Sequence, residues 1–74
     1  MKNTTITTSV YLATYGRRPQ GRAIWGFCPK ERWDNDDYIE HIHWSRGCKT
    51  YSEARREAVD HFTHRGVTEA IVCP

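Results

Sequence analysis

Apolar and polar residues alternate along the first part of the chain, over residues 4–15. Ile6 and Val10 fall on one side of the alternation, and Tyr11 and Tyr15 fall on the other. A period of two with β-branched and aromatic residues is typical of a strand. We therefore predict that this segment forms the first strand.

The following segments predict a hairpin and then a loop. Residues 16–21 contain two glycines and a proline, which favour a turn. Residues 22–28 predict a second strand, and the short connection predicts antiparallel pairing with the first. Residues 29–36 are mostly polar and predict a loop.

A third strand is predicted over residues 37–45, where Tyr38, Ile42 and Trp44 share one face. We expect this face to point towards the helix that follows. An acidic residue interrupts the face, and a bulge would move it to the rim, because an extra residue re-aims the side chains after it. Tyr38, Ile39 and Ile42 also fit one face of a short helix, but the β-branched and aromatic content favours the strand.

A helix is predicted to begin at Thr50. Glu53 follows at the spacing of a capping box, in which two side chains satisfy free backbone N–H groups. Gly66 marks the end, because a helix C-terminus favours positive φ, and residues 67–73 predict a last strand. The predicted buried face consists of Tyr51, Ala54, Ala58 and Phe62. The predicted solvated face consists of Glu53, Arg56, Glu57, Asp60 and His64.

These elements predict a single α+β domain over residues 1–74 with the order β-β-β-α-β. We expect a mostly antiparallel four-stranded sheet with one helix on one face. The helical crossover lets the last strand lie parallel to an earlier one. One helix covers one face only, so the other face is expected to be open to solvent. That face would present Tyr11, Ala13, Tyr15, Ile39, His41 and His43.

Composition limits the classes of function. The 74 residues carry a net charge of +2 and three cysteines. No run approaches the roughly 18 apolar residues of a membrane span, and the N-terminus lacks the apolar segment of a signal peptide. We therefore expect no membrane partner and a cytoplasmic location, where the cysteines would be reduced thiols.

Histidines and cysteines are the residues most able to carry chemistry. His41 and His43 are two apart, and His61 and His64 lie three apart on the predicted helix. No cysteine pair at short spacing accompanies them, although structural zinc sites usually have one. Cys48 is the best candidate nucleophile, but no spacing identifies a base for it. We therefore predict no bound metal, no cofactor and no enzymatic activity.

Charge is distributed unevenly along the chain. Basic residues gather around the first turn and acidic residues between positions 31 and 40, so either pole could face a charged partner. Aromatic residues and arginine are also enriched at the centres of protein interfaces. The predicted partner-binding residues are Tyr11, Tyr15, Arg17, Arg18, Arg22, Trp25, Trp33, Asp34, Asp36 and Asp37.

The order of the predicted elements resembles the first half of the ribonuclease H fold. The similar segments are residues 10–16, 25–27, 50–62 and 69–72. In that family the first strand ends in an acidic residue, where this chain has Tyr15, and the helix carries a metal-binding glutamate, where this chain has Arg55. Two magnesium ions need such carboxylates. The resemblance therefore implies the fold without the nuclease activity.

Size and architecture also resemble small phage-encoded inhibitors such as anti-CRISPR and antirestriction proteins, which occlude a surface on a host machine. This resemblance implies a non-enzymatic inhibitor that sterically blocks a nucleic-acid-handling or defence complex in the host cytoplasm. The arginines would engage acidic or phosphate-bearing surfaces, or the aspartates of residues 34–37 would mimic phosphates. The alternative is a small nucleic-acid-binding module that uses Arg17, Arg18 and Arg22 with surface aromatics. A monomer and a dimer through an exposed strand edge are both open.

Overall fold

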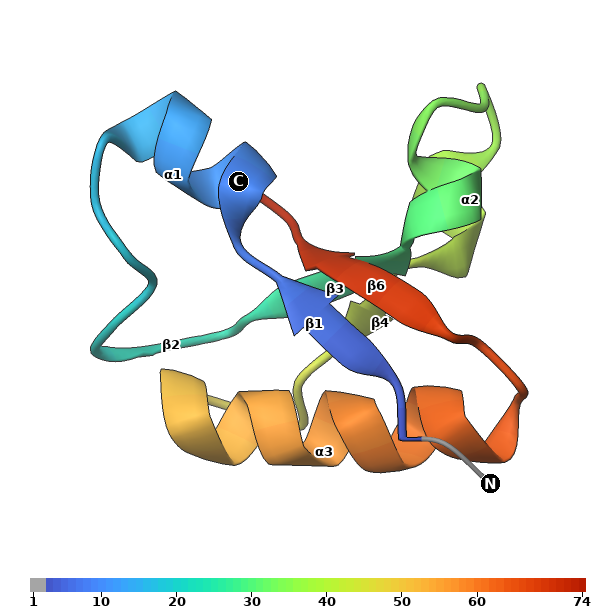
Figure 1. Ribbon diagram of the computed structural model, residues 1–74. Coiled ribbons are helices and arrows are strands. Elements are labelled where there is room, and N and C mark those ends of the chain that lie inside the picture. The colour runs from blue at the N-terminus through green and yellow to red at the C-terminus, as the bar shows by residue number, and fades with distance from the viewer. Residues whose placement is uncertain (1–2) are drawn as a thin grey trace.

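A mixed four-stranded sheet lies across one long helix (Figure 1). The computed structural model describes residues 3–74 of the chain. Its elements confirm the predicted α+β class. In chain order they are β1 (Thr5–Thr7), α1 (Ser9–Tyr15), β2 (Arg22–Ala23), β3 (Gly26–Pro29), α2 (Lys30–Trp33), the 3-10 helix η1 (Tyr38–His41), β4 (His43–Trp44), β5 (Lys49–Thr50), α3 (Tyr51–His64) and β6 (Glu69–Val72).

The strands of the main sheet follow the order β1-β6-β3-β4. β6 pairs parallel with β1 and antiparallel with β3, and β3 pairs antiparallel with β4. The prediction that the last strand lies parallel to an earlier one is therefore confirmed. β2 and β5 form a separate two-stranded antiparallel sheet. The strand order departs from the predicted β-β-β-α-β arrangement, because the first two strands of the main sheet are not paired with each other.

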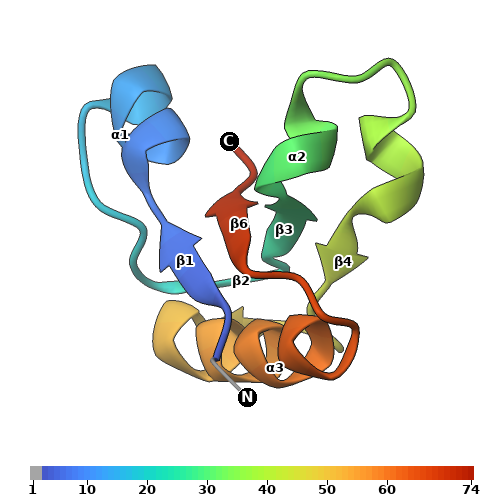
Figure 2. The ribbon, with the colours of Figure 1, turned by 45° about the vertical axis from the view of Figure 1, so that its right-hand side comes forward.

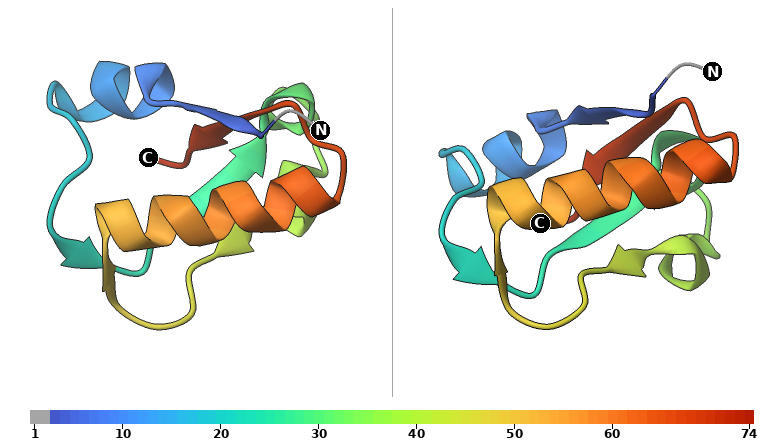
Figure 3. Two further views of the ribbon diagram at one scale, coloured as in Figure 1. Left: turned by 60° about the horizontal axis from the view of Figure 1, so that its bottom comes forward. Right: turned by 90° about the horizontal axis from the view of Figure 1, so that it is seen from below.

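α3 runs across one face of the sheet (Figure 3). Its first turn holds the predicted capping box: the Glu53 N–H donates to the Thr50 hydroxyl, and the Glu53 carboxylate accepts from the Thr50 N–H. Ala54, Ala58 and Phe62 are buried on the side that meets the sheet. The predicted helix, its cap and its apolar face are confirmed.

The core lies between α3 and the inner face of the sheet. Phe27 and Val72 are fully buried and oppose each other across β3 and β6. Burial of each such side chain stabilises the fold by about 1.5–3 kcal/mol. Trp25, just before β3, extends this core and packs edge-on against Tyr51, with 5.3 Å between the ring centroids.

The other face of the sheet is flanked by α1 on one side and by α2 with η1 on the other (Figure 2). Cys28 and Ile71 pair across β3 and β6 on this face, and both are buried. The predicted open face is therefore partly covered. The reason is that segments predicted as a strand and a loop form short helices, which pack against the edges of this face.

The predicted first strand over residues 4–15 is only three residues long and leads into α1. A period of two and a period of 3.6 are hard to distinguish over so few residues, and Tyr11 and Tyr15 are also four apart, the spacing of neighbours on a helix. Gly16 ends α1 with a φ of 70°, and its N–H donates to the carbonyl of Leu12. Without a long first strand the predicted hairpin does not form. The segment compared with the first strand of ribonuclease H is helical here.

The other predicted strands and the predicted loop are also divided. Residues 22–29 form β2 and β3, separated by a two-residue link. The polar segment over residues 29–36 contains α2. Residues 37–45 form η1 followed by β4. The first half of this segment is therefore helical, as the alternative interpretation of its apolar spacing allowed, and only the second half is a strand. Residues 67–73 contain the predicted last strand as β6.

Candidate protein-binding surface

A surface depression of about 330 Å³ opens beside β3, between α1 and β4. We call it the aromatic depression. Side chains from α1, the link between β2 and β3, β4 and the C-terminal end of the chain form its walls. The lining residues are Tyr11, Tyr15, Arg17, Gln20, Ala23, Ile24, Trp25, Gly26, Trp44, Cys73 and Pro74.

Trp44 is the largest exposed side chain of this surface. Because His43 points towards α3 and side chains alternate along a strand, Trp44 points away from α3. Its partner across the ladder is Gly26, and the indole ring lies directly against that glycine. Trp44 nevertheless stays 56% exposed. The expectation that Trp44 faces the helix is wrong, because the strand register turns this residue outwards.

Tyr11 and Tyr15 form the opposite wall from successive turns of α1. Their ring centroids are 4.6 Å apart. Tyr11 also packs against Trp25, at 5.9 Å between ring centroids, and this contact attaches the short helix to the core. Tyr15 is 50% exposed. Tyr11 therefore positions the helix, and Tyr15 presents its ring to solvent.

Ile24 and Arg17 complete the rim of the aromatic depression. Ile24 lies in the link between β2 and β3 and is 61% exposed. Arg17 follows the glycine that ends α1 and is also exposed. An aliphatic side chain, two exposed aromatic rings and a guanidinium thus surround one concave surface.

Trp25 lines the aromatic depression but exposes too little surface to be the anchor that was predicted. It is only 6% exposed. Its indole N–H donates to the carbonyl of Lys49 at 3.2 Å, and its backbone N–H donates to the hydroxyl of Ser45 at 3.0 Å. Trp25 is therefore a core residue whose polar groups hold the segment before β5.

The remaining predicted arginines lie near the aromatic depression without lining it. Arg18 is exposed in the loop after α1. Arg22 is exposed on β2, where its guanidinium donates to the carbonyl of Cys48 at 3.5 Å. Together with Arg17 they make the side of the molecule near α1 basic.

The predicted acidic residues lie at the far end of the molecule, in the loop after α2 (Figure 1). Asp34 and Asp36 are exposed there. Asp37 accepts from His41 at 3.4 Å and lies 4.0 Å from the Arg32 guanidinium. The structure therefore separates the predicted binding residues into a basic aromatic side and an acidic side.

Trp33, predicted as a loop anchor, packs within the acidic side. It is half-buried at the end of α2, and its ring meets Tyr38 of η1 edge-on, with 5.0 Å between the ring centroids. This contact joins α2 to η1. Trp33 thus holds the acidic loop in shape.

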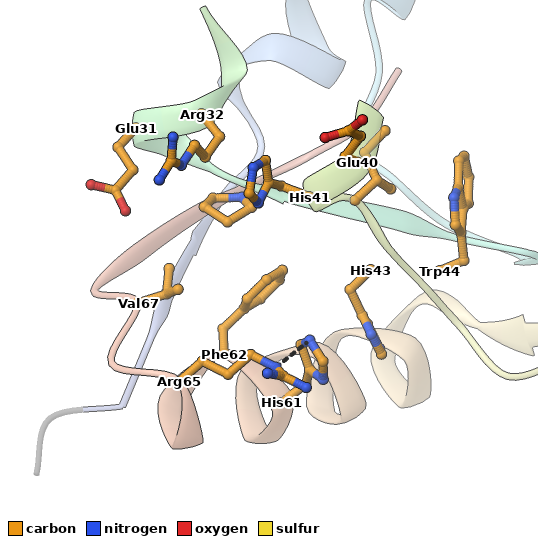
Figure 4. A pocket seen from close by; sticks show the side chains of 12 residues that line it. Glu31, Arg32, Glu40, His41, His43, Trp44, His61, Phe62, Arg65 and Val67 are labelled. Atoms are coloured by element: carbon orange, nitrogen blue, oxygen red, sulfur yellow. Dashed lines mark hydrogen bonds between the residues drawn. The ribbon is translucent and has the colours of Figure 1, made fainter. Parts of the chain in front are cut away.

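A second hollow, of about 430 Å³, lies between α3 and the segment formed by α2, η1 and β4 (Figure 4). Its histidines come from three different elements. The rings of His43 and His61 stack at 4.1 Å between centroids, with 23° between their planes. His41 lies on η1 and not beside His43 on one strand face. Within residues 3–74 no three His, Cys, Asp or Glu side chains are grouped so that they could hold a metal ion.

Glu57 connects α3 to the segment that carries Trp44. Its carboxylate accepts from His43 Nε2 at 3.2 Å, from the Arg46 backbone N–H at 3.2 Å, and from the Lys49 ammonium. These contacts lower the pKa of Glu57, the hydrogen bond from Lys49 most of all. Glu57 was expected among the solvated residues of the helix. It is instead the residue that holds the β4–β5 connection against the helix.

The cysteines occupy three different environments. Cys48 is exposed. Cys28 is buried, and burial, with a smaller effect from the charge of Asp37, raises the pKa of its thiol. Burial raises the pKa of the Cys73 thiol to about 12, with a smaller contribution from Cys28. Thiolate formation is thus suppressed at the two cysteines nearest the sheet.

Among the large exposed apolar residues of the aromatic depression, the sequence prediction missed Trp44 and Ile24. One signal for Trp44 was present: Gly26 interrupts a strand pattern, and a glycine in a strand often marks the close approach of another group. Ile24 lies in the predicted second strand, where the alternation sets it opposite Trp25 and Phe27 without indicating which set faces the core. Only the split between β2 and β3 places it outside the core.

Comparison of the chain with protein-family models, with curated proteins and with solved structures found no match. No helix within residues 3–74 has the length and apolar character needed to cross a bilayer.

Proposed function

We propose that this protein is a non-enzymatic binding protein that docks a partner protein on its aromatic depression. The supporting observation is that Tyr15, Ile24 and Trp44, each half exposed or more, surround one concave surface with Arg17 on its rim. Tryptophan, tyrosine and arginine are the residues that most often dominate the binding energy of protein interfaces. Contiguous exposed apolar side chains likewise mark interaction sites.

The charge distribution would orient the partner. Arg17 and Arg18 lie beside the aromatic depression, so a partner surface with acidic or phosphate-bearing groups would be attracted to this side. The acidic loop around Asp36 lies at the other end of the molecule and would repel the same surface. A wrongly oriented encounter is therefore disfavoured.

We further propose that the protein is an inhibitor of the kind that phages encode, and that it sterically blocks a nucleic-acid-handling or defence complex of the host. Small size and a bipolar surface support this proposal. In this function the acidic loop, with Asp34, Asp36 and Asp37, would occupy a basic channel of the target as a phosphate mimic, while the aromatic depression supplies the apolar contact.

A second candidate function is binding of single-stranded nucleic acid. The observation that favours it is the same grouping of Tyr15, Trp44 and Arg17, because bases stack on exposed aromatic rings and a nearby guanidinium contacts phosphate. Its affinity would fall steeply with salt.

An affinity pull-down from a lysate of the host cell, with and without nuclease, tests both functions. The decisive comparison is between the wild type, Trp44→Ala and Ile39→Ala. Ile39 is 65% exposed on η1, outside the aromatic depression, and is the matched control. Loss of a central aromatic anchor costs at least about 2 kcal/mol, which is roughly 30-fold in affinity.

A partner protein that survives nuclease, is lost with Trp44→Ala and is retained with Ile39→Ala would support the proposal. Recovery of nucleic acid alone, reduced by the same variant, would favour the second candidate. A partner retained by Trp44→Ala would exclude the aromatic depression as its site. The double variants Arg17→Glu with Arg18→Glu and Asp36→Lys with Asp37→Lys then show which charged side contributes.

A further inference from the structure

His43 and His61 stack face to face where β4 meets α3 (Figure 4). Phe62 packs edge-on against both rings, at 6.0 Å from His43 and 5.1 Å from His61 between centroids. The His43 side chain is only 14% exposed. Two imidazole rings in this arrangement resist carrying two positive charges, because like charges at this separation repel and water does not screen them fully.

Each ring also has its own hydrogen-bond partner. His43 Nε2 lies 3.2 Å from Glu57 Oε1, and an ionised carboxylate only accepts, so His43 donates. Arg65 Nε donates to His61 Nε2 at 3.0 Å. A guanidinium cannot accept a hydrogen bond, so His61 Nε2 must carry no proton. The fold therefore binds the neutral form of His61.

The surrounding groups favour the same form. Burial lowers the pKa of His61 most, followed by the charges of His43 and Arg65. Glu57 raises the pKa by a smaller amount, and Arg46 lowers it by less still. The other titratable and charged groups that line the hollows next to the pair are Glu31, Arg32, Glu40, His41, Lys49, Asp60 and His64.

We propose that the His43–His61 pair is a pH sensor that controls the position of β4 and of the connection to β5. A proton taken from water at His61 Nε2 removes the acceptor of the Arg65 hydrogen bond and places a positive charge against the His43 ring and the Arg65 guanidinium. β4 is a two-residue strand at the edge of the sheet. Few backbone hydrogen bonds hold it in place, so we expect β4, and not α3, to move when the two rings separate. Its movement would carry Trp44 out of the aromatic depression.

The direction of the pH dependence follows from the proton count. We call the state with the two rings stacked closed and the state with β4 separated from α3 open. In the open state His61 returns to its ordinary pKa of about 6.5, whereas in the closed state its pKa is lower. The closed state is therefore fully favoured above about pH 6.5 and is lost as the pH falls towards the lowered value. Within that window the opening equilibrium rises by up to about tenfold for each pH unit, because opening takes up one proton.

Amide hydrogen exchange of the free protein between pH 8 and pH 5, corrected for intrinsic exchange rates, tests this proposal without any partner. Protection of residues 43–49 should fall on acidification. His61→Phe keeps a flat ring in the stack but takes up no proton, so in this variant the protection of residues 43–49 should stay constant over the same pH range. His61→Gln, which keeps a neutral acceptor for Arg65, serves the same purpose if the first variant does not fold. His64 is an exposed histidine on the same helix, so the protection in His64→Gln should depend on pH as it does in the wild type.

Titration of the histidine ring signals by NMR provides an independent measurement on the wild type. The midpoint of His61 should lie below about 6.5, the ordinary value for histidine. A midpoint at or above that value would overturn the proposal. Constant protection of residues 43–49 in the wild type, or an unchanged pH dependence in both His61 variants, would overturn it equally.

Discussion

The indole ring of Trp44 lies against the backbone of Gly26, so closely that a Cβ on residue 26 would stand 2.7 Å from Cζ3 of the ring. The two residues face each other across β3 and β4. An exposed tryptophan is thereby held in one orientation on the surface. A side chain that is ordered before binding loses less entropy when a partner arrives.

Replacement of this glycine should displace the tryptophan. In Gly26→Ala the new methyl group overlaps the ring, and because Trp44 is half exposed the ring can swing outwards. We expect a loss of about 1 kcal/mol in the free energy of unfolding, at the low end of overpacking costs, and a larger relative loss of partner binding. Urea denaturation and the pull-down measure the two effects. A variant with unchanged binding would show that the fixed indole is not used.

Loss of the Glu57 carboxylate should weaken the fold at neutral pH. The pKa of Glu57 is lowered from 4.5, so its contribution to stability is present above about pH 4.5 and is lost as the pH falls through the lowered value. Glu57→Gln should reduce the free energy of unfolding by about 1.5 kcal/mol at pH 7, as expected for hydrogen bonds to a charged group, and by much less at pH 3.

Urea denaturation at both pH values checks this prediction, with Asp60→Asn as the control. Asp60 is on the same helix, and its side chain is 78% exposed, so its loss should change little. An equal loss for Glu57→Gln at pH 7 and pH 3 would contradict an ionic origin.

The capping box should contribute measurably to the stability of α3. Thr50→Ala removes the hydroxyl that accepts from the Glu53 N–H and should cost about 1 kcal/mol. Thr50→Ser keeps an oxygen at the same position and should cost much less. Chemical denaturation of the two variants checks the difference, and equal losses would assign the effect to packing of the threonine methyl group.

The thiols should differ in reactivity. At pH 7.5 a thiol reagent should modify Cys48 rapidly, because this residue is exposed. Cys28 is buried, and Cys73 has a pKa of about 12, so both should react only when the protein unfolds. The expected result is one fast thiol in the native protein and three in urea, with no fast thiol in Cys48→Ser. Rapid reaction of a second native thiol would be inconsistent with this packing.

The local sequence was sufficient for α3 and the strand that follows it. A helix of this length repeats its apolar face over several turns, so its period is unambiguous, and the capping box and Gly66 mark its ends. The parallel placement of β6 beside β1 follows because a helix crossover brings the chain back in the same direction. The helix, its ends and the strand after it lie in one continuous segment, so their prediction needs little information from the rest of the chain.

The short segments before α3 could not be assigned in the same way. Over residues 8–15 and 37–41 the apolar positions fit a helix as well as a strand, and packing against distant residues decides between them. Tyr11 meets Trp25, and η1 packs against β3, only after the chain has folded. Propensity in such short elements is weaker than these tertiary contacts.

The sequence by itself determined the α+β class, the amphipathic helix with its cap, and the separation of basic from acidic loops, because each depends on residues close together in the chain. The tertiary structure decided which aromatic residues are available to a partner. Trp25, predicted to bind a partner, is buried, and Trp44, predicted to face the helix, is exposed. The facing of a strand residue changes with every one-residue shift in register, and only the pairing of β3 with β4 and β6 sets that register.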